Sequence, residues 1–274
     1  MKKAIFVSGL PRAMTTLMCN VLANNPRIGG GETSPLLEYL YGARANYSNT
    51  PEVKASLTED IMLESFLEFC RAGIDGYAKS ITQKEIYLDK SRGWVYYAEF
   101  LWKLIPDAKI IIMVRDLRSV VTSLEKKWRE NPEILDQRDS PQQQGFITID
   151  QRVNNFINDA PLGIALKRLY NAYQTKMLDK MHVVRAEDFS ANPEKVMRGV
   201  YAYLGEEYYA MDYTNVKQVT IENDRIGDFG IYGDHQIKSN IQPLKKDSSE
   251  ILGSALYNGI KANNQWFYDA FKYY

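Results

Sequence analysis

The stretch AIFVSGLPRAMTTLMCNVLANNP, residues 4–26, constrains the fold more strongly than any other part of the chain. Its first residues are continuously apolar and predict a strand over 3–8 that is buried on both faces. A turn at Gly9 follows, and residues 14–24 predict a helix that ends at Asn-Asn-Pro. A buried strand that leads directly into a helix is typical of a parallel α/β sheet.

Strands and helices alternate along the rest of the chain. Apolar runs predict strands at 85–91, 109–116 and 181–189. The segments between them predict helices at 57–78, 93–104, 117–129, 151–178, 193–204 and 247–272. We therefore predict an α/β fold, a doubly wound parallel sheet flanked by helices, in a single domain over 1–274. Ligands on such sheets bind beyond the carboxyl ends of the strands.

Three segments predict irregular structure. Residues 129–150 are polar and rich in Pro and Gln, which predicts a long loop or a mobile lid. The second segment, 220–245, contains Gly227, Gly230 and Gly233. The third, GGGETSPLLEYLYG, predicts a flexible turn followed by a short helix.

The composition limits the class of protein. Lys plus Arg and Asp plus Glu both number 34, so the net charge indicates neither a nucleic-acid partner nor a membrane surface. No segment approaches the ~20 apolar residues of a membrane span, and the N-terminal apolar run is too short for a signal peptide. Cys19 and Cys70 allow one disulfide, but two buried thiols in a reducing compartment are favoured. We expect a soluble, cytoplasmic protein.

The turn after the first strand has the length of a phosphate-binding loop, G-x-x-x-x-G-K-[ST]. From Gly9 the chain reads G-L-P-R-A-M-T-T, so Met14 replaces the second glycine and Thr15 replaces the lysine. That lysine reaches the β- and γ-phosphates of a nucleoside triphosphate. A helix N-terminus still attracts an anion, and Arg12 adds a positive charge. The loop therefore suits a shorter anionic chain that needs no Mg²⁺, with an ordinary strand–turn–helix as the alternative.

A second anion-binding pattern follows the strand at 109–116. MVRDLRSVVTSLEKKW places Arg115 at the carboxyl end of the strand and Ser123 on the helix that follows. An arginine and a hydroxyl suit a phosphate group, because arginine can donate two parallel hydrogen bonds to its oxygens. The alternative is a helix-capping Asp116 beside a solvated arginine.

Together these stretches resemble the sulfotransferase family that uses 3′-phosphoadenosine 5′-phosphosulfate. GLPRAMTTL resembles the family's 5′-phosphosulfate loop, P-[RK]-[SA]-G-[TS]-T, and VRDLRSVVTS resembles its 3′-phosphate motif, R-D-x-R-x-x-x-x-S. VVRAEDFSANPEKVMRGVYAYLG, at 183–205, is similar to a third block of the family. The resemblance implies a fold like that of P-loop NTPases and the transfer of a sulfuryl group to a hydroxyl or amine.

The resemblance also implies which residues bind the donor. The 3′-phosphate would be bound by Arg115 and Ser123, and a lysine that contacts the cofactor in relatives corresponds to Lys238. The 5′-phosphosulfate would be bound by the loop residues Arg12, Ala13, Met14, Thr15 and Thr16. No metal ion is expected.

The catalytic residues are implied by two shorter likenesses to the tyrosylprotein branch and its glycan-modifying relatives. NPRIGGGETSPLLEYL resembles the segment that carries the catalytic glutamate and maps the base onto Glu32, whose alternative role is helix capping. YLDKSRGW maps the catalytic lysine onto Lys90, which with Arg12 would stabilise charge on the leaving group. Relatives with a K-x-H motif use its histidine as the base, but this chain has Arg92 there, which stays protonated.

The two histidines lie outside these motifs. We expect His182, which opens a strand, to be structural. We expect His235, in the late irregular segment, to be exposed or to touch substrate.

Three departures from the family's pattern bear on donor affinity: Met14, Ala186 and Gly233. A small-molecule or nucleotide kinase and a non-catalytic nucleotide-binding relative remain alternatives. The acceptor would be a glycan, a peptide tyrosine or a small metabolite, in a pocket formed by the loops at 40–56, 129–150 and 220–236.

Overall fold

The computed structural model describes residues 3–55, 59–130, 148–222, 235–245 and 249–273. Within them, five strands form one sheet in the order β2-β3-β1-β4-β5, and every neighbouring pair is parallel. This confirms the predicted fold class. The strands are β1 (Lys3–Gly9), β2 (Ile28–Thr33), β3 (Ile86–Lys90), β4 (Lys109–Val114) and β5 (His182–Arg185).

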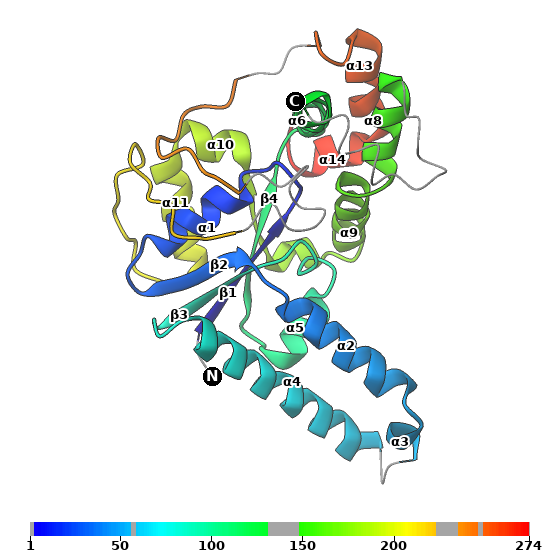
Figure 1. The fold of residues 1–274 in the computed structure, drawn as a ribbon, viewed down its shortest axis with the longest axis vertical. Coiled ribbons are helices and arrows are strands. Elements are labelled where there is room, and N and C mark those ends of the chain that lie inside the picture. Colours follow the sequence, from blue (N-terminus) through cyan, green and yellow to red (C-terminus); the bar gives the residue numbers. More distant parts are fainter. Residues whose placement is uncertain (1–2, 56–58, 131–147, 223–234, 246–248, 274) are drawn as a thin grey trace.

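Helices cover both faces of the sheet. Figure 1 shows α1 and α11 on one side and α5 and α9 on the other. The N-terminal helices are α1 (Thr15–Ala23), α2 (Leu36–Asn49), α3 (Pro51–Lys54), α4 (Glu59–Ile81), α5 (Ala98–Leu104) and α6 (Leu117–Glu130). Those that follow are α8 (Ile149–Asn158), α9 (Leu162–Gln174), the 3₁₀ helix η1 (Met177–Lys180), α10 (Ala186–Ala191), α11 (Pro193–Leu204), α13 (Ser254–Asn263) and α14 (Gln265–Ala270).

The centre of the sheet is the core of the molecule. All residues of β1 after Lys3 are buried, as are residues 110–114 of β4. Continuous apolar runs of this kind suit strands that are covered by helices on both faces. The core therefore lies on β1 and β4, and the ends of these two strands position the loops described below.

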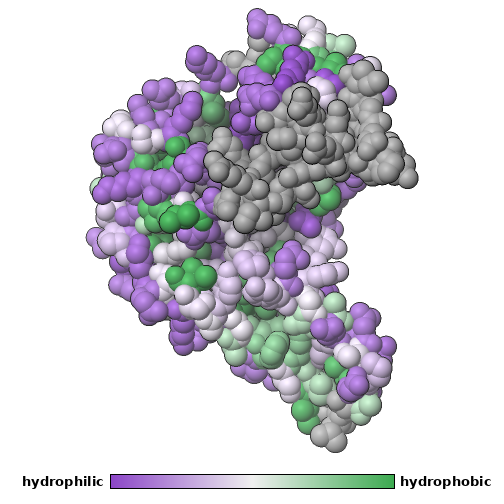
Figure 2. All heavy atoms as spheres, viewed as in Figure 1, coloured by the Kyte–Doolittle hydropathy of each residue, from purple (hydrophilic) through white to green (hydrophobic). Residues whose placement is uncertain are grey.

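Helices α2, α3 and α4 form an arm that projects from the body of the molecule (Figure 1). Aromatic rings join the arm to α5: Tyr47 stacks on Phe66 at 4.4 Å, and Phe66 lies 6.0 Å from Phe100. Figure 2 shows hydrophobic and hydrophilic side chains intermixed on the visible face of the arm.

β2 is a strand where the glycine-rich sequence predicts a flexible turn. Gly30 and Gly31 have φ values of 97° and 104°, and the register against β3 shifts between Gly30 and Thr33. A Cβ at Gly30 would lie 2.5 Å from the carbonyl oxygen of Leu88. The glycines are therefore needed for a bulged edge strand that approaches β3 closely, and backbone pairing with β3 outweighs their low strand propensity.

Other predicted boundaries also differ. The strand predicted at 181–189 ends at Arg185, and α10 follows it. The helix predicted at 151–178 is divided at Pro161, because proline cannot continue a helix interior. The helix predicted at 247–272 is divided between α13 and α14. Most of the predicted lid at 129–150 and part of the irregular segment at 220–245 lie outside the described residues.

Both cysteines are buried free thiols, which confirms the favoured prediction. Burial is the main cause that raises the pKa of Cys19 to about 12, and burial raises the pKa of Cys70 to about 11. Among the described residues, no helix combines the length and apolar character needed to cross a membrane.

Candidate active site

The loop after β1 is shaped by its neighbour β4. A Cβ at Gly9, which has a φ of 146°, would lie 2.2 Å from the carbonyl oxygen of Met113. The same oxygen accepts a hydrogen bond of 2.9 Å from the backbone N–H of Leu10. Only glycine fits this approach, so Gly9 directs the chain out of the sheet and into the N-terminus of α1.

Two residues of the loop have left-handed backbone conformations. Arg12 has a φ of 59°, and Met14, the residue before α1, has φ 63° and ψ 24°. Met14 thus adopts a left-handed backbone conformation that glycine adopts without strain, at a cost of about 1–2 kcal/mol. Its half-buried side chain packs against the core, which partly offsets that cost. Within the described residues no side chain caps α1, so its first N–H groups face the loop.

The structure brings the two predicted anion-binding motifs together. Arg12 donates a hydrogen bond of 3.1 Å from Nε to Oγ of Ser123, which lies on α6. Arg115, which follows β4, donates one of 3.0 Å from Nη1 to the carbonyl oxygen of Arg12. Two guanidinium groups, a hydroxyl and a helix N-terminus therefore meet beyond the carboxyl ends of β1 and β4.

Neighbouring side chains hold this motif in place. The Asp116 carboxylate accepts hydrogen bonds of 2.9 Å from Nε of Arg118 and from the hydroxyl of Tyr268. It also accepts one from the backbone N–H of Arg118. Asp116 therefore caps the N-terminus of α6, as the alternative interpretation of this motif predicts.

Further along α6, the fully buried Glu125 forms an ion pair of 2.7 Å with Arg152 of α8.

Lys90, the last residue of β3, lies at the same edge of the sheet and is buried. Its ammonium contacts the carboxylate of Glu222, which also accepts a hydrogen bond of 2.7 Å from Thr33 and lies 3.2 Å from Nε2 of His235. Sequence reasoning missed Glu222, because a single acidic residue in an irregular segment matches no motif.

Glu32 is half-buried on β2. Within the described part of the chain its carboxylate makes no hydrogen bond or ion pair. The charge of Glu32 acts on the Cys19 thiol of α1. Burial is the main cause that raises the pKa of this thiol; Lys90 lowers it, and Glu222, Asp89 and Glu32 raise it further. The two predicted catalytic residues, Glu32 and Lys90, therefore lie on neighbouring strands, and both affect the pKa of the Cys19 thiol on α1.

A buried carboxylate supports the segment after Lys90. Asp89 is fully buried and accepts hydrogen bonds of 2.5 Å from the Tyr87 hydroxyl and from Nε1 of Trp94. Burial is the main cause that raises the pKa of Asp89, and these hydrogen bonds act in the opposite direction. Asp89 thus fixes the turn between Lys90 and Trp94.

The remaining predicted residues do not join the cluster. Lys238 is exposed, and no hydrogen bond or ion pair joins it to the loop within the described residues. Ala186 is buried at the start of α10, and Gly233 lies outside the described residues. His182 stacks on Tyr203 at 5.1 Å at the amino end of β5, and burial lowers its pKa.

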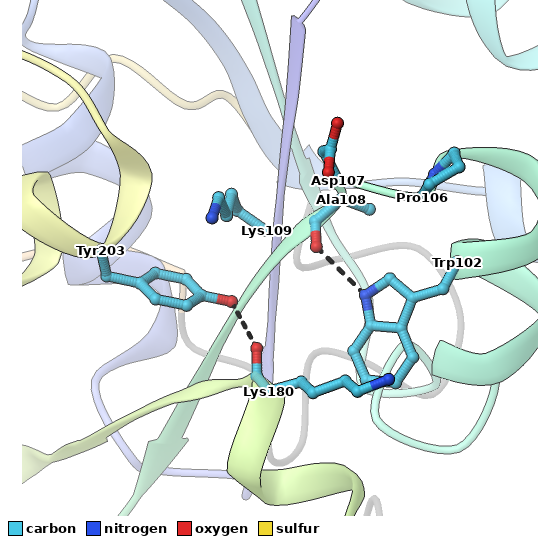
Figure 3. Close-up of a pocket in the computed structure, with 7 residues that line it drawn as sticks. All are labelled: Trp102, Pro106, Asp107, Ala108, Lys109, Lys180 and Tyr203. Carbon is cyan, nitrogen blue, oxygen red and sulfur yellow. Dashed lines mark hydrogen bonds between the residues drawn. The ribbon is translucent and has the colours of Figure 1, made fainter.

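A pocket of about 190 Å³ lies at the opposite edge of the sheet, where β4 begins. Figure 3 shows Trp102 and Tyr203 on two sides of it, with Lys180 between them. Because Lys109 is the first residue of β4, this pocket is remote from the carboxyl edge where the predicted residues lie. Within the described ranges, no three His, Cys, Asp or Glu side chains group in a way that could hold a metal ion.

The parallel sheet, with a loop at its carboxyl edge that joins Arg12 to Ser123 and Arg115, defines the molecule as an α/β protein. The model of the sulfotransferase family matches residues 4–210, which is more than half of the chain. The chain therefore belongs to the sulfotransferase family.

The relatives support the same assignment. The chain is 27% identical over 128 residues to protein-tyrosine sulfotransferase A of Caenorhabditis elegans, an alignment that covers 44% of this chain and 32% of that protein. It is 28% identical over 176 residues to a putative protein-tyrosine sulfotransferase of Caenorhabditis briggsae, covering 62% and 59%. The chain thus spans less than two thirds of the length of these relatives.

One solved structure has the same fold over almost the whole chain. The sulfotransferase domain from the curacin biosynthetic pathway superposes with a TM-score of 0.50. The match is 15% identical and covers 96% of this chain and 97% of that one. At this identity the likeness concerns the fold alone.

Proposed function

We propose that this protein transfers a sulfuryl group from 3′-phosphoadenosine 5′-phosphosulfate to a hydroxyl or amine of an acceptor. The observation that carries the proposal is the contact between Arg12 and Ser123. It joins the two motifs whose family counterparts bind opposite ends of the donor. Membership of the family supports the class of reaction.

The residues at the carboxyl edge fit the donor's charge. The first N–H groups of α1, Thr15, Thr16 and Arg12 would hold the 5′-phosphosulfate, because a helix N-terminus and a guanidinium both favour an anion. Arg115 and Ser123 would hold the 3′-phosphate. When bound, the donor supplies the sulfuryl group, and adenosine 3′,5′-bisphosphate is the leaving group.

The chain's own residues would then perform two tasks. Lys90 is buried at the end of β3, where its ammonium can stabilise negative charge that develops on the leaving group. Glu32, on the neighbouring strand, would take the proton of the acceptor. Both tasks depend on fixed positions, which the paired strands β2 and β3 supply.

A kinase on the same fold is the first alternative. It requires the loop lysine, which is Thr15 here, and an acidic ligand for Mg²⁺ after a core strand. Asp116 has the right place for that ligand, but its carboxylate is engaged by Arg118 and Tyr268. A non-catalytic relative is the second alternative, and the strained Met14 is the observation that favours it.

The class of acceptor is proposed from the relatives. The protein-tyrosine sulfotransferases are named for a tyrosine acceptor. We therefore place a tyrosine-containing peptide first among acceptors, before a glycan or a small metabolite.

Calorimetry tests the proposal directly. We expect the protein to bind adenosine 3′,5′-bisphosphate and not ATP with Mg²⁺, and to transfer ³⁵S-labelled sulfuryl groups to an acceptor. Arg12→Ala should abolish this binding, whereas Arg198→Ala, at a 59% exposed position on α11, should not change it. Preference for ATP, or equal binding by both variants, would overturn the assignment.

A further inference from the structure

Glu222 is the centre of a buried polar cluster at the carboxyl edge of the sheet. One carboxylate oxygen contacts the ammonium of Lys90, and the other accepts the Thr33 hydroxyl at 2.7 Å and lies 3.2 Å from Nε2 of His235. The three partners come from the end of β3, the end of β2 and the segment before α13. Glu222, although remote in sequence, thus contacts the ends of the adjacent strands β2 and β3.

Lys90, Glu222 and His235 are largely shielded from water, whereas Thr33 lies at the exposed rim of the cluster. The side chains of Lys90 and Glu222 are 7% and 9% exposed, and that of His235 is 16% exposed. A charge this deep in a protein needs an opposite charge or several hydrogen bonds, since removal from water costs several kcal/mol per ion. Among the described residues, Glu222 is the hydrogen-bond partner found for the Lys90 ammonium.

Resting on the proposed function, we propose that Glu222 is a positioning residue for sulfuryl transfer, which pairs with the Lys90 ammonium and keeps it aimed at the reacting centre. An ammonium has three N–H donors, so a bond to Glu222 leaves two for other acceptors. Glu222 can therefore bind the Lys90 ammonium and still leave N–H donors for the leaving group. Thr33 and His235 hold the second oxygen and fix the plane of the carboxylate.

Within the described residues, the other acidic groups near the cluster do not pair with Lys90. Asp89 accepts hydrogen bonds from Tyr87 and Trp94. Glu32 forms no ion pair within the described residues. Cys19 stays a thiol because burial raises its pKa to about 12.

A double-mutant cycle between Glu222 and Lys90 tests the proposal. Glu222→Gln keeps the side-chain shape and removes the charge. We expect it to lower kcat about 10- to 100-fold with a smaller change in KM, which is less than the ~10²–10³-fold loss from removing a direct donor. In a Lys90→Met background the same change should have no further effect, because Glu222 acts through Lys90.

The cycle has two readouts besides activity. Glu222→Gln should weaken binding of adenosine 3′,5′-bisphosphate about 3- to 10-fold when Lys90 is present and not in Lys90→Met. The two changes should also lower Tm by less together than the sum of their separate effects. Glu207→Gln, on an exposed glutamate, is the matched control and should leave every readout unchanged.

The outcomes separate the two proposals. If the wild-type protein binds no bisphosphate, the proposed function is wrong and the role of Glu222 falls with it. If it binds and the cycle is additive, only the role of Glu222 is wrong. If Glu222→Gln does not fold, Thr33→Val removes one bond to Glu222 and should change kcat in the same direction by a smaller factor.

Discussion

Arg12 and Ser123 are 111 residues apart in the chain and are joined by a hydrogen bond of 3.1 Å. The bond connects the loop after β1 to α6, and Arg115 adds a second connection to the carbonyl oxygen of Arg12. The two motifs proposed to bind the donor are therefore in direct contact. A change in one motif should alter the geometry of the other.

Arg115→Ala should weaken binding of adenosine 3′,5′-bisphosphate about 10- to 150-fold, as expected for a charge-assisted contact worth about 1.5–3 kcal/mol. Calorimetry measures this change, and far-UV circular dichroism should show an unchanged fold. Arg198→Ala is the control for general loss of positive charge. An unaltered dissociation constant for Arg115→Ala would refute the 3′-phosphate role.

Met14→Gly should be more stable than Met14→Ala by about 1 kcal/mol. Both variants lose the packing of the methionine side chain, but only glycine adopts a φ of 63° without strain. The difference in free energy of unfolding between the two variants, measured in urea, gives the cost of the left-handed backbone conformation. Equal stability would mean that the left-handed conformation carries no cost here.

Asp89→Asn should be more stable, relative to wild type, as the pH rises. Burial raises the folded-state pKa of Asp89 above its unfolded value, so ionisation disfavours the folded state. The group's contribution is complete below the unfolded pKa of about 3.9 and is lost as the pH rises to the folded pKa. Urea unfolding from pH 4 to 8 measures the difference. A constant difference between the two proteins would contradict the shift.

Cys19 and Cys70 should both resist thiol reagents in the native protein. Their pKa values, raised to about 12 and about 11 mainly by burial, keep them protonated at pH 8, and the thiolate is the reactive form. Ellman's reagent should therefore modify neither thiol until guanidinium unfolds the chain, and then both. Rapid reaction of the native protein would show that one of them is accessible.

Glu125→Ala should destabilise the fold by about 3–5 kcal/mol, because it removes the carboxylate from a buried ion pair with Arg152. Thermal unfolding measures the loss. Glu130→Ala is the matched control, since Glu130 is 59% exposed and its pairing with Lys127 contributes little. Similar losses in both variants would show that the buried pair does not hold α6 to α8.

The two motifs that meet at the carboxyl edge were recognisable in the sequence because their signals are local. The spacing from Gly9 to Thr16 and the pattern from Arg115 to Ser123 each specify a strand, a turn and a helix within a few residues. The sequence also singled out Met14, which stands where the loop pattern has a glycine, and the structure shows its positive φ. Burial of Cys19 followed from its place on the apolar face of the first predicted helix.

Two features depend on packing between distant segments. Glycines 29–31 have low strand propensity, and only the approach of β3 turns them into an edge strand. Glu222 has no local pattern, and it reaches Lys90 across 132 positions of sequence because the chain returns to the carboxyl edge after α11.

The sequence by itself therefore determined the fold class, the order of its main strands and helices, and the two motifs for which we propose anion binding, since apolar periodicity and turn chemistry act over short stretches. The partner of Lys90, the strand that carries Glu32 and the junction of Arg12 with Ser123 arise only in the folded chain. They require burial and backbone pairing between segments that no local pattern connects.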